Sequence, residues 1–152
     1  MAPAASNPPI RGIFIGLGSN LGDRAGTLSA ALERLGQTPG IRLVARSGFH
    51  ETVAVGGPSG QPDYLNAAAE LESTLAPEEL LVRLQEIENA FLRRREIPNG
   101  PRTLDLDLLI FGDQRRNDPQ LQLPHPRMWS RPFVLEPLSE ICDLEALRKR
   151  FL

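Results

Sequence analysis

Short apolar runs and alternating apolar and polar residues predict four β-strands along the chain. They cover residues 11–18, 41–49, 65–73 and 103–111. In the third strand every second residue is apolar, and the side chains of a strand point alternately to its two faces. One face of that strand should therefore lie against a core, through Leu65, Ala67, Ala69 and Leu71.

Two further stretches repeat their apolar residues with the period of an amphipathic helix. The first covers residues 25–35, and Gly36 is expected to end it. The second covers residues 76–92, where Pro77 suits the first helical turn. A short terminal helix is expected over residues 144–150. The predicted buried stripes are Leu28, Ala31, Leu32 and Leu35 in the first helix, and Leu80, Leu84, Ile87 and Phe91 in the second.

The order of these elements, β-α-β-β-α-β, predicts an α+β fold of the ferredoxin-like type. Such a fold has an antiparallel sheet with helices packed on one face, so we expect loops or water on the other face. A stretch rich in glycine and proline, residues 51–64, is expected to be a long ligand-binding loop. Residues 1–10 are expected to be disordered, and residues 11–152 to form a single domain.

Composition and charge narrow the range of partners. The 152 residues carry a net charge of -2, which gives no general affinity for nucleic acid or for an anionic membrane. The single cysteine, Cys142, allows no internal disulfide. No segment reads as a secretory signal or as a membrane-spanning helix. We expect a cytoplasmic monomer.

The last predicted strand carries two aspartates where alternation would place them on the same face. Asp105 and Asp107 lie two residues apart, so their backbones are ~7 Å apart on that face. Two like charges this close repel, and aspartate is disfavoured in strands. Mg²⁺ would relieve the repulsion, because it takes oxygen ligands from one or two carboxylates, phosphates and water. The alternative is a solvent-facing strand surface that happens to be acidic.

Arginines flank this strand on both sides in the sequence. Arg93, Arg95 and Arg102 precede it and Arg131 follows it. Guanidinium groups bind phosphate oxygens, and carboxylates for a metal beside them are the parts needed for phosphoryl transfer. The arginines before the strand could instead belong to a solvated loop.

Two other features have a functional and a structural interpretation. His125 lies between two prolines that restrict its backbone, so it could donate to a phosphate or carry a proton. Taken alone, its position is more typical of a turn histidine without a role. The glycine-rich segment 16–23 could bind an anion at a helix N-terminus, but it is more typical of a plain strand-to-helix turn.

Five motifs in this order closely resemble one enzyme family. They are "GLGSNLGDR", "QPDYLNAAAELES", "LQEIE", "GPRTLDLDLLIFG" and "LPHPRMWSRPFVLEPLSEI". Together they resemble the bacterial 6-hydroxymethyl-7,8-dihydropterin pyrophosphokinases of folate biosynthesis, from Ile13 to about Ile141. The resemblance implies a ferredoxin-like fold. It also implies transfer of pyrophosphate from ATP to the pterin hydroxymethyl group, which releases AMP.

The resemblance also implies roles for individual residues. Two Mg²⁺ ions would be held by the triphosphate together with Asp105 and Asp107. For the reaction itself, we expect Arg95 and Arg102 to stabilise charge as the bond to AMP breaks and His125 to assist at a phosphate oxygen. Asp107 is a candidate general base only if the metal does not occupy all its lone pairs. ATP would contact Gln85, Glu88, Arg93, Arg95, Arg102, His125 and Arg131, and the pterin would contact Thr52, Val55, Tyr64, Asn66 and Phe133. The chain departs from the family pattern at Leu92, Asn99 and Pro126.

Two other classes of function remain open on the residues alone. A ferredoxin-like domain can bind RNA or a regulatory ligand, although this chain has aspartates where an RNA-binding sheet carries aromatic residues. The same carboxylates could also serve a metal-dependent phosphohydrolase.

Overall fold

The computed structural model describes residues 8–52, 63–91 and 104–152 of the chain. Its main sheet is five-stranded, and a small two-stranded sheet stands apart from it. The strands are β1 (Ile10–Ser19), β2 (Ile41–Arg46), β3 (His50–Thr52), β4 (Tyr64–Ser73), β5 (Asp105–Phe111), β6 (Arg116–Asn117) and β7 (Gln122–Leu123). The helices are α1 (Arg24–Gln37), α2 (Pro77–Phe91), α3 (Pro132–Ser139) and α4 (Leu144–Phe151), with a 3₁₀ turn at Met128–Ser130.

The main sheet has the strand order β2-β4-β1-β5, and every neighbouring pair is antiparallel. β3 also pairs with β4, beyond the end of β2. With α1 between β1 and β2 and α2 between β4 and β5, this is the predicted ferredoxin-like order. The α+β fold class is confirmed.

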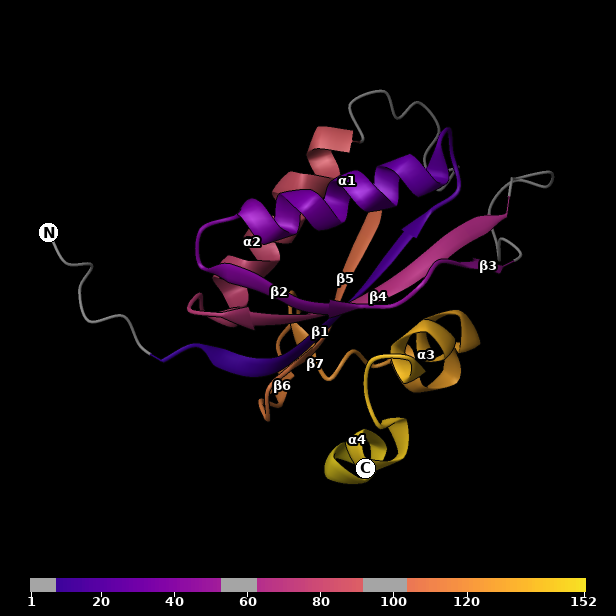
Figure 1. The fold of residues 1–152 in the computed structure, drawn as a ribbon. Helices are drawn as coiled ribbons and strands as arrows, with labels where there is room; N and C mark the ends of the chain where they lie inside the picture. Colours follow the sequence, from indigo (N-terminus) through magenta and orange to yellow (C-terminus); the bar gives the residue numbers. More distant parts are fainter. Residues whose placement is uncertain (1–7, 53–62, 92–103) are drawn as a thin grey trace, which may run out of the picture.

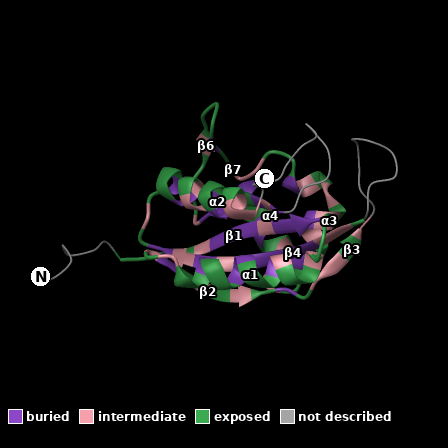
Figure 2. Ribbon diagram, turned by 90° about the horizontal axis from the view of Figure 1, so that it is seen from above, coloured by how far each residue is buried: buried purple, intermediate pink, exposed green. Residues whose placement is uncertain are grey.

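Helices α1 and α2 cover one face of the sheet (Figures 1 and 2). They bury the apolar stripes that the sequence predicts, except that Phe91 is only partly buried. Asp23 begins α1, where its side chain accepts a hydrogen bond from the Gly26 N–H at 3.0 Å. The prediction that Gly36 ends this helix is wrong. The helix continues to Gln37, and Thr38 ends it by donating its own N–H to Leu35. The turn that follows uses Gly40, which has a φ of 88°.

The other face of the sheet is covered by α3 and α4 (Figure 1). Their apolar residues form a second buried cluster with the sheet: Phe14, Ala68, Leu109, Ile110, Met128, Val134, Leu138, Leu147 and Phe151. The expectation of loops or water here is therefore wrong. A β-bulge at Leu109 in β5 lets Leu108 face one cluster while Leu109 and Ile110 face the other.

The strand predicted over residues 41–49 is interrupted. β2 ends at Arg46 and β3 begins at His50. At the break, the buried Ser47 uses its hydroxyl as well as its backbone: Oγ accepts from the Ala68 N–H and the Ser47 N–H donates to the Ala68 carbonyl, both at 2.9 Å. The side chain thus replaces one ladder hydrogen bond, and the chain can turn away before pairing again.

Several sequence predictions fall outside the described residues. They concern residues 1–7, most of the predicted loop at 51–64, and the site candidates Val55, Arg93, Arg95 and Arg102. Within the described parts, no helix is long and apolar enough to cross a membrane.

Candidate active site

The two aspartates of β5 share one face of the sheet, as the alternation predicts. Their neighbours Leu104, Leu106 and Leu108 are buried in the core under α1 and α2. Asp105 is half-buried and Asp107 is exposed, on the face that carries α3 and α4. The sheet face under α3 and α4 is therefore acidic at one end, and at its other end it contributes residues to the second apolar cluster.

Two glycines of β1 face the aspartates across the strand pair. Gly18 pairs with Asp105 and Gly16 pairs with Asp107, so both glycines lie on the same face as the carboxylates. Leu17, between them, is buried in the core. Because glycine has no side chain, this part of the sheet surface is an open floor beside the carboxylates. The glycine-rich segment "GLGSNLGD" thus starts within strand β1, and its last residue, Asp23, caps helix α1.

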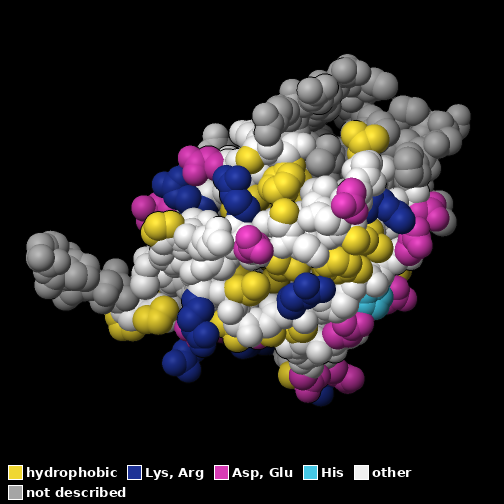
Figure 3. Space-filling view, turned by 45° about the horizontal axis from the view of Figure 1, so that its top comes forward, with side chains coloured by type: hydrophobic (Ala, Val, Ile, Leu, Met, Phe, Trp, Pro, Cys, Tyr) yellow, Lys and Arg dark blue, Asp and Glu magenta, His cyan; other side chains and the backbone are white. Residues whose placement is uncertain are grey.

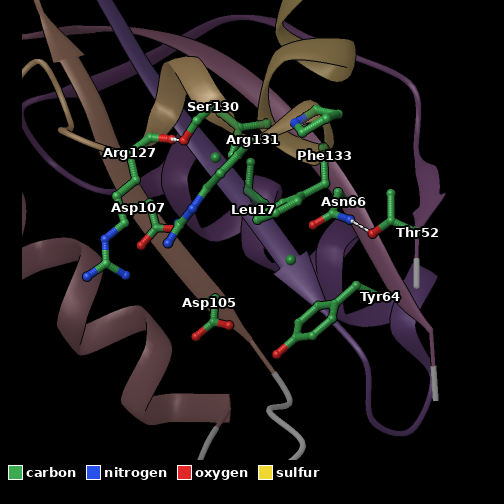
Figure 4. A pocket seen from close by; sticks show the side chains of 15 residues that line it. Leu17, Thr52, Tyr64, Asn66, Asp105, Asp107, Arg127, Ser130, Arg131 and Phe133 are labelled. Atoms are coloured by element: carbon green, nitrogen blue, oxygen red, sulfur yellow. Dashed lines mark hydrogen bonds between the residues drawn. The ribbon is translucent and has the colours of Figure 1, made fainter. Parts of the chain in front are cut away.

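A cavity of about 660 Å³ lies above this floor. This volume is typical of sites for small molecules. Figure 4 shows Asp105, Asp107, Arg127 and Arg131 on one side of the cavity, and Thr52, Asn66, Tyr64 and Phe133 on the other. The structure thus brings together seven residues predicted from the sequence: Asp105, Asp107, Arg131, Thr52, Asn66, Tyr64 and Phe133.

The uncharged side of the cavity combines amide, hydroxyl and aromatic groups. Asn66 is buried, and its Nδ2 donates a hydrogen bond of 2.6 Å to Thr52 Oγ1. Tyr64 comes from the start of β4 and Phe133 from the first turn of α3. Such a surface suits a flat, polar-edged ring, because the ring can stack on aromatic faces while its edge bonds an amide.

The charged side has two arginines beside the carboxylates. Arg131 immediately precedes α3, and its guanidinium carbon lies 5.6 Å from the centre of the Phe133 ring. Arg127 precedes the 3₁₀ turn, and its carbonyl accepts a hydrogen bond from Ser130 Oγ at 3.1 Å. Sequence reasoning missed Arg127, Ser130, Gly16 and Gly18 as lining residues. The only signal for Arg127 was its position two residues after His125.

His125 is held beside the cavity by its backbone and ring. Its N–H donates to the carbonyl of Leu109, the bulge residue, at 2.8 Å. Its Nδ1 accepts the Arg127 N–H at 3.2 Å, which leaves Nε2 as the N–H donor of a neutral ring. Burial lowers the pKa of His125, the charge of Asp107 opposes that shift, and Arg131 and Arg127 add to it. The imidazole is therefore neutral near pH 7.

Two other predicted residues lie on α2, apart from the cavity lining. Gln85 is exposed. Glu88 Oε2 accepts a hydrogen bond of 2.7 Å from the Leu106 N–H, between the two aspartates. Glu88 therefore fastens α2 to the strand that carries the carboxylates.

The donor set fits Mg²⁺ in its chemistry. Carboxylate oxygens are hard ligands, and Asp105 and Asp107 face the same open floor. In the three described ranges no group of three or more His, Cys, Asp or Glu side chains could by itself hold a metal. Two carboxylates leave most of an octahedral shell to phosphate oxygens and water, which is the usual way proteins bind Mg²⁺ with a nucleotide.

The cavity of this ferredoxin-like domain has carboxylates and arginines at one end and aromatic and amide groups at the other. Such a site defines a class of ligand-binding proteins that can hold a phosphorylated ligand beside a flat ring. The chain belongs to the 7,8-dihydro-6-hydroxymethylpterin-pyrophosphokinase family, whose sequence profile matches residues 14–143.

Curated relatives are similar over most of the chain. The 2-amino-4-hydroxy-6-hydroxymethyldihydropteridine pyrophosphokinase of Bacillus subtilis is 46% identical over 130 residues, which is 86% of this chain and 77% of the relative. The enzyme of the same name from Pseudomonas aeruginosa is 42% identical over 132 residues, 87% of this chain and 81% of the relative. That of Haemophilus influenzae is 44% identical over 130 residues, 86% of this chain and 81% of the relative.

Proposed function

We propose that this protein transfers pyrophosphate from ATP to 6-hydroxymethyl-7,8-dihydropterin in folate biosynthesis, forming the pterin pyrophosphate and AMP. The observation that carries the proposal is a cavity with a charged side and a ring-binding side, in a chain of the pyrophosphokinase family. The charged side would take the triphosphate and the other side the pterin.

The ring-binding side supplies the contacts that a pterin needs. Tyr64 and Phe133 would lie against the faces of its ring, and Asn66 would pair with its polar edge. Thr52 would contribute through its backbone, as would Val55, which lies outside the described residues. A buried amide tied to Thr52 is already oriented, so little entropy is lost when the ring binds.

The charged side would bind the nucleotide. Arg131 lies at the cavity and His125 beside it. We include Gln85, Glu88, Arg93, Arg95 and Arg102 in the same role from the family resemblance. Asp105 and Asp107 would hold Mg²⁺, two ions when ATP is bound, and the metal would supply positive charge to the phosphate oxygens.

In the reaction, the pterin hydroxyl oxygen bonds to the β-phosphorus of ATP, and the bond from that phosphorus to the bridging oxygen of AMP breaks. The hydroxyl proton leaves to water or to a base, for which Asp107 is a candidate. Arg95 and Arg102 would stabilise the charge that develops on the leaving AMP, and the neutral His125 would donate Nε2–H to a phosphate oxygen. The residues mainly orient the two substrates and neutralise charge.

The rival classes are less well supported. Binding of nucleic acid by electrostatics needs a basic surface, whereas basic and acidic side chains are interspersed on the face drawn in Figure 3. The open sheet surface carries the two aspartates rather than a row of aromatic residues.

The test is an assay of AMP formation from ATP and Mg²⁺, with and without 6-hydroxymethyl-7,8-dihydropterin. We expect AMP only with the pterin, in equal amount to the pterin pyrophosphate formed. AMP or ADP release that is independent of the pterin would instead indicate a phosphohydrolase. If no nucleotide is consumed with both substrates and the metal present, the protein is a binding module and the proposal is wrong.

A further inference from the structure

Strand β3 carries part of the binding site. It has 3 residues, and in the described parts it pairs only with β4. Its last residue, Thr52, lies opposite Tyr64 in β4, and both line the cavity. Besides this backbone pairing, side-chain contacts from two helices hold the described ends of β3 and β4.

One such contact comes from α3. Glu140, at the C-terminal end of this helix, uses both carboxylate oxygens: Oε1 accepts the Gly48 N–H at 2.8 Å, and Oε2 lies 2.6 Å from His50 Nε2. Gly48 lies in the break between β2 and β3, where the sheet ladder is interrupted. The Gly48 N–H, and then His50, lower the pKa of Glu140, so the side chain is ionised at neutral pH. Glu140 therefore fastens the start of β3 to the helix that carries Phe133.

A second contact comes from the opposite face of the sheet, from the first residue of α1. Arg24 Nη2 lies 2.9 Å from Glu51 Oε2, and Arg24 Nη1 donates to the Asp63 carbonyl at 2.7 Å. Glu51 immediately precedes Thr52, and Asp63 immediately precedes Tyr64. One guanidinium fork thus ties the end of β3 to the start of β4.

Each residue of β3 is therefore held by a different element: His50 by α3, Glu51 by α1, and Thr52 by Asn66 of β4. We propose that Arg24 and Glu140 are positioning residues for the pterin substrate. Neither lines the cavity, but together they clamp β3 from both faces of the sheet and so set the positions of Thr52 and Tyr64. This inference rests on the proposed function.

The clamp is expected to affect substrate binding more than stability. The side chain of Arg24 is 28% exposed and that of its partner Glu51 is 56% exposed, while His50 and Glu140 are 27% and 43% exposed. Ion pairs this exposed add little to the free energy of unfolding. A small displacement of a ring-binding residue, by contrast, can change the kinetics by one or two orders of magnitude.

The test measures KM for each substrate, kcat and Tm in Arg24→Ala, Glu140→Ala and the double variant. Arg83→Ala is the control, because Arg83 forms an ion pair of comparable exposure with Glu86 on α2, at 2.6 Å and away from the cavity. We expect the pterin KM to rise roughly tenfold in each single variant, with the ATP KM and Tm near wild type. Arg83→Ala should change none of these values.

Two further readouts separate positioning from general damage. Both residues hold the same strand, so the double variant should raise the pterin KM by less than the product of the single effects. Amide hydrogen exchange at residues 50–52 should be faster in each variant. Arg24→Lys and Glu140→Gln, which each keep one of the contacts, should recover part of the pterin affinity.

The inference is overturned if the variants bind pterin like wild type, if both KM values rise together, or if the loss follows a fall in Tm. These outcomes leave the proposed function intact as long as the wild-type protein makes AMP only with pterin. A wild-type protein without that activity would refute the proposed function, and the positioning role with it.

Discussion

At the scale of single residues, the arrangement of Asp105 and Asp107 depends on what faces them. A strand pattern alone predicts that the two carboxylates share a face. It does not reveal that Gly16 and Gly18 lie opposite, because a glycine-rich segment before a helix is more typical of a turn. The two glycines are the reason that the carboxylates face an open floor. Cross-strand neighbours could not be predicted from the sequence without the register.

Arg127 is the residue that the structure adds to the charged side of the cavity. We expect the Arg127 guanidinium to donate a hydrogen bond to a phosphate oxygen of ATP. The Arg127→Ala variant would lose this charged hydrogen bond, worth about 1.5–3 kcal/mol, and should bind ATP roughly 10- to 100-fold more weakly. Titration of a non-hydrolysable ATP analogue would measure this. Arg127→Lys, which keeps the charge, should lose less, and its pterin affinity should be unchanged. An alanine variant with wild-type ATP affinity would place Arg127 outside the nucleotide site.

At the scale of helices and strands, the periodicity of apolar residues predicted the long regular elements best. Helix α2 and strand β4 follow the predicted periodicity because one face of each packs on a single core. The break between β2 and β3 was not predictable, because it depends on Ser47 bonding to Ala68 in another strand. Helix α3 was also missed. It has 8 residues and contains Pro137, so its stability comes from packing rather than helix propensity.

Strand β1 offers a test at this scale, because Gly18 lies under the ring-binding side of the cavity. A Cβ at this position would lie 3.1 Å from Asn66 Oδ1 and 3.4 Å from the Tyr64 ring. Gly18→Ala should therefore displace both side chains and raise the pterin KM by about tenfold, with little effect on ATP binding. Steady-state kinetics with each substrate varied in turn would measure this.

Gly36→Ala is the matched control, because a Cβ there meets only Leu43 Cβ, at 4.0 Å. Within helix α1 this change should leave activity intact and raise the free energy of unfolding by about 0.5–1 kcal/mol. Equal loss of activity in both alanine variants would contradict the role given to Gly18.

In the whole molecule, the sheet carries a buried apolar cluster on each face, and the C-terminal helices cover the second face except at the cavity. The strand and helix order was enough to predict the sheet topology, because the ferredoxin-like arrangement follows from that order. The packing of α3 and α4 could not be predicted in the same way, because it joins segments far apart in the sequence. That packing also brings Arg131 and Phe133 to the cavity.

We propose that the two cores unfold as one unit, since both pack on the same strands. Leu84 is 1% exposed in one core and Leu138 is 0% exposed in the other. Leu84→Ala and Leu138→Ala should each lower the free energy of unfolding by about 2–5 kcal/mol, and both should keep a single transition. Denaturant titration followed by circular dichroism and by Trp129 fluorescence would show this. Two separate transitions in either variant would instead mean that the C-terminal helices unfold independently.

The proposed reaction depends on Asp105 and Asp107 binding the metal that accompanies ATP. The most direct test counts bound Mn²⁺, a substitute for Mg²⁺, by electron paramagnetic resonance with a non-hydrolysable ATP analogue. We expect two bound ions per wild-type chain, and metal binding weaker by roughly tenfold or more in Asp105→Asn and Asp107→Asn at unchanged Tm. Wild-type Mn²⁺ affinity and number in both variants would contradict it.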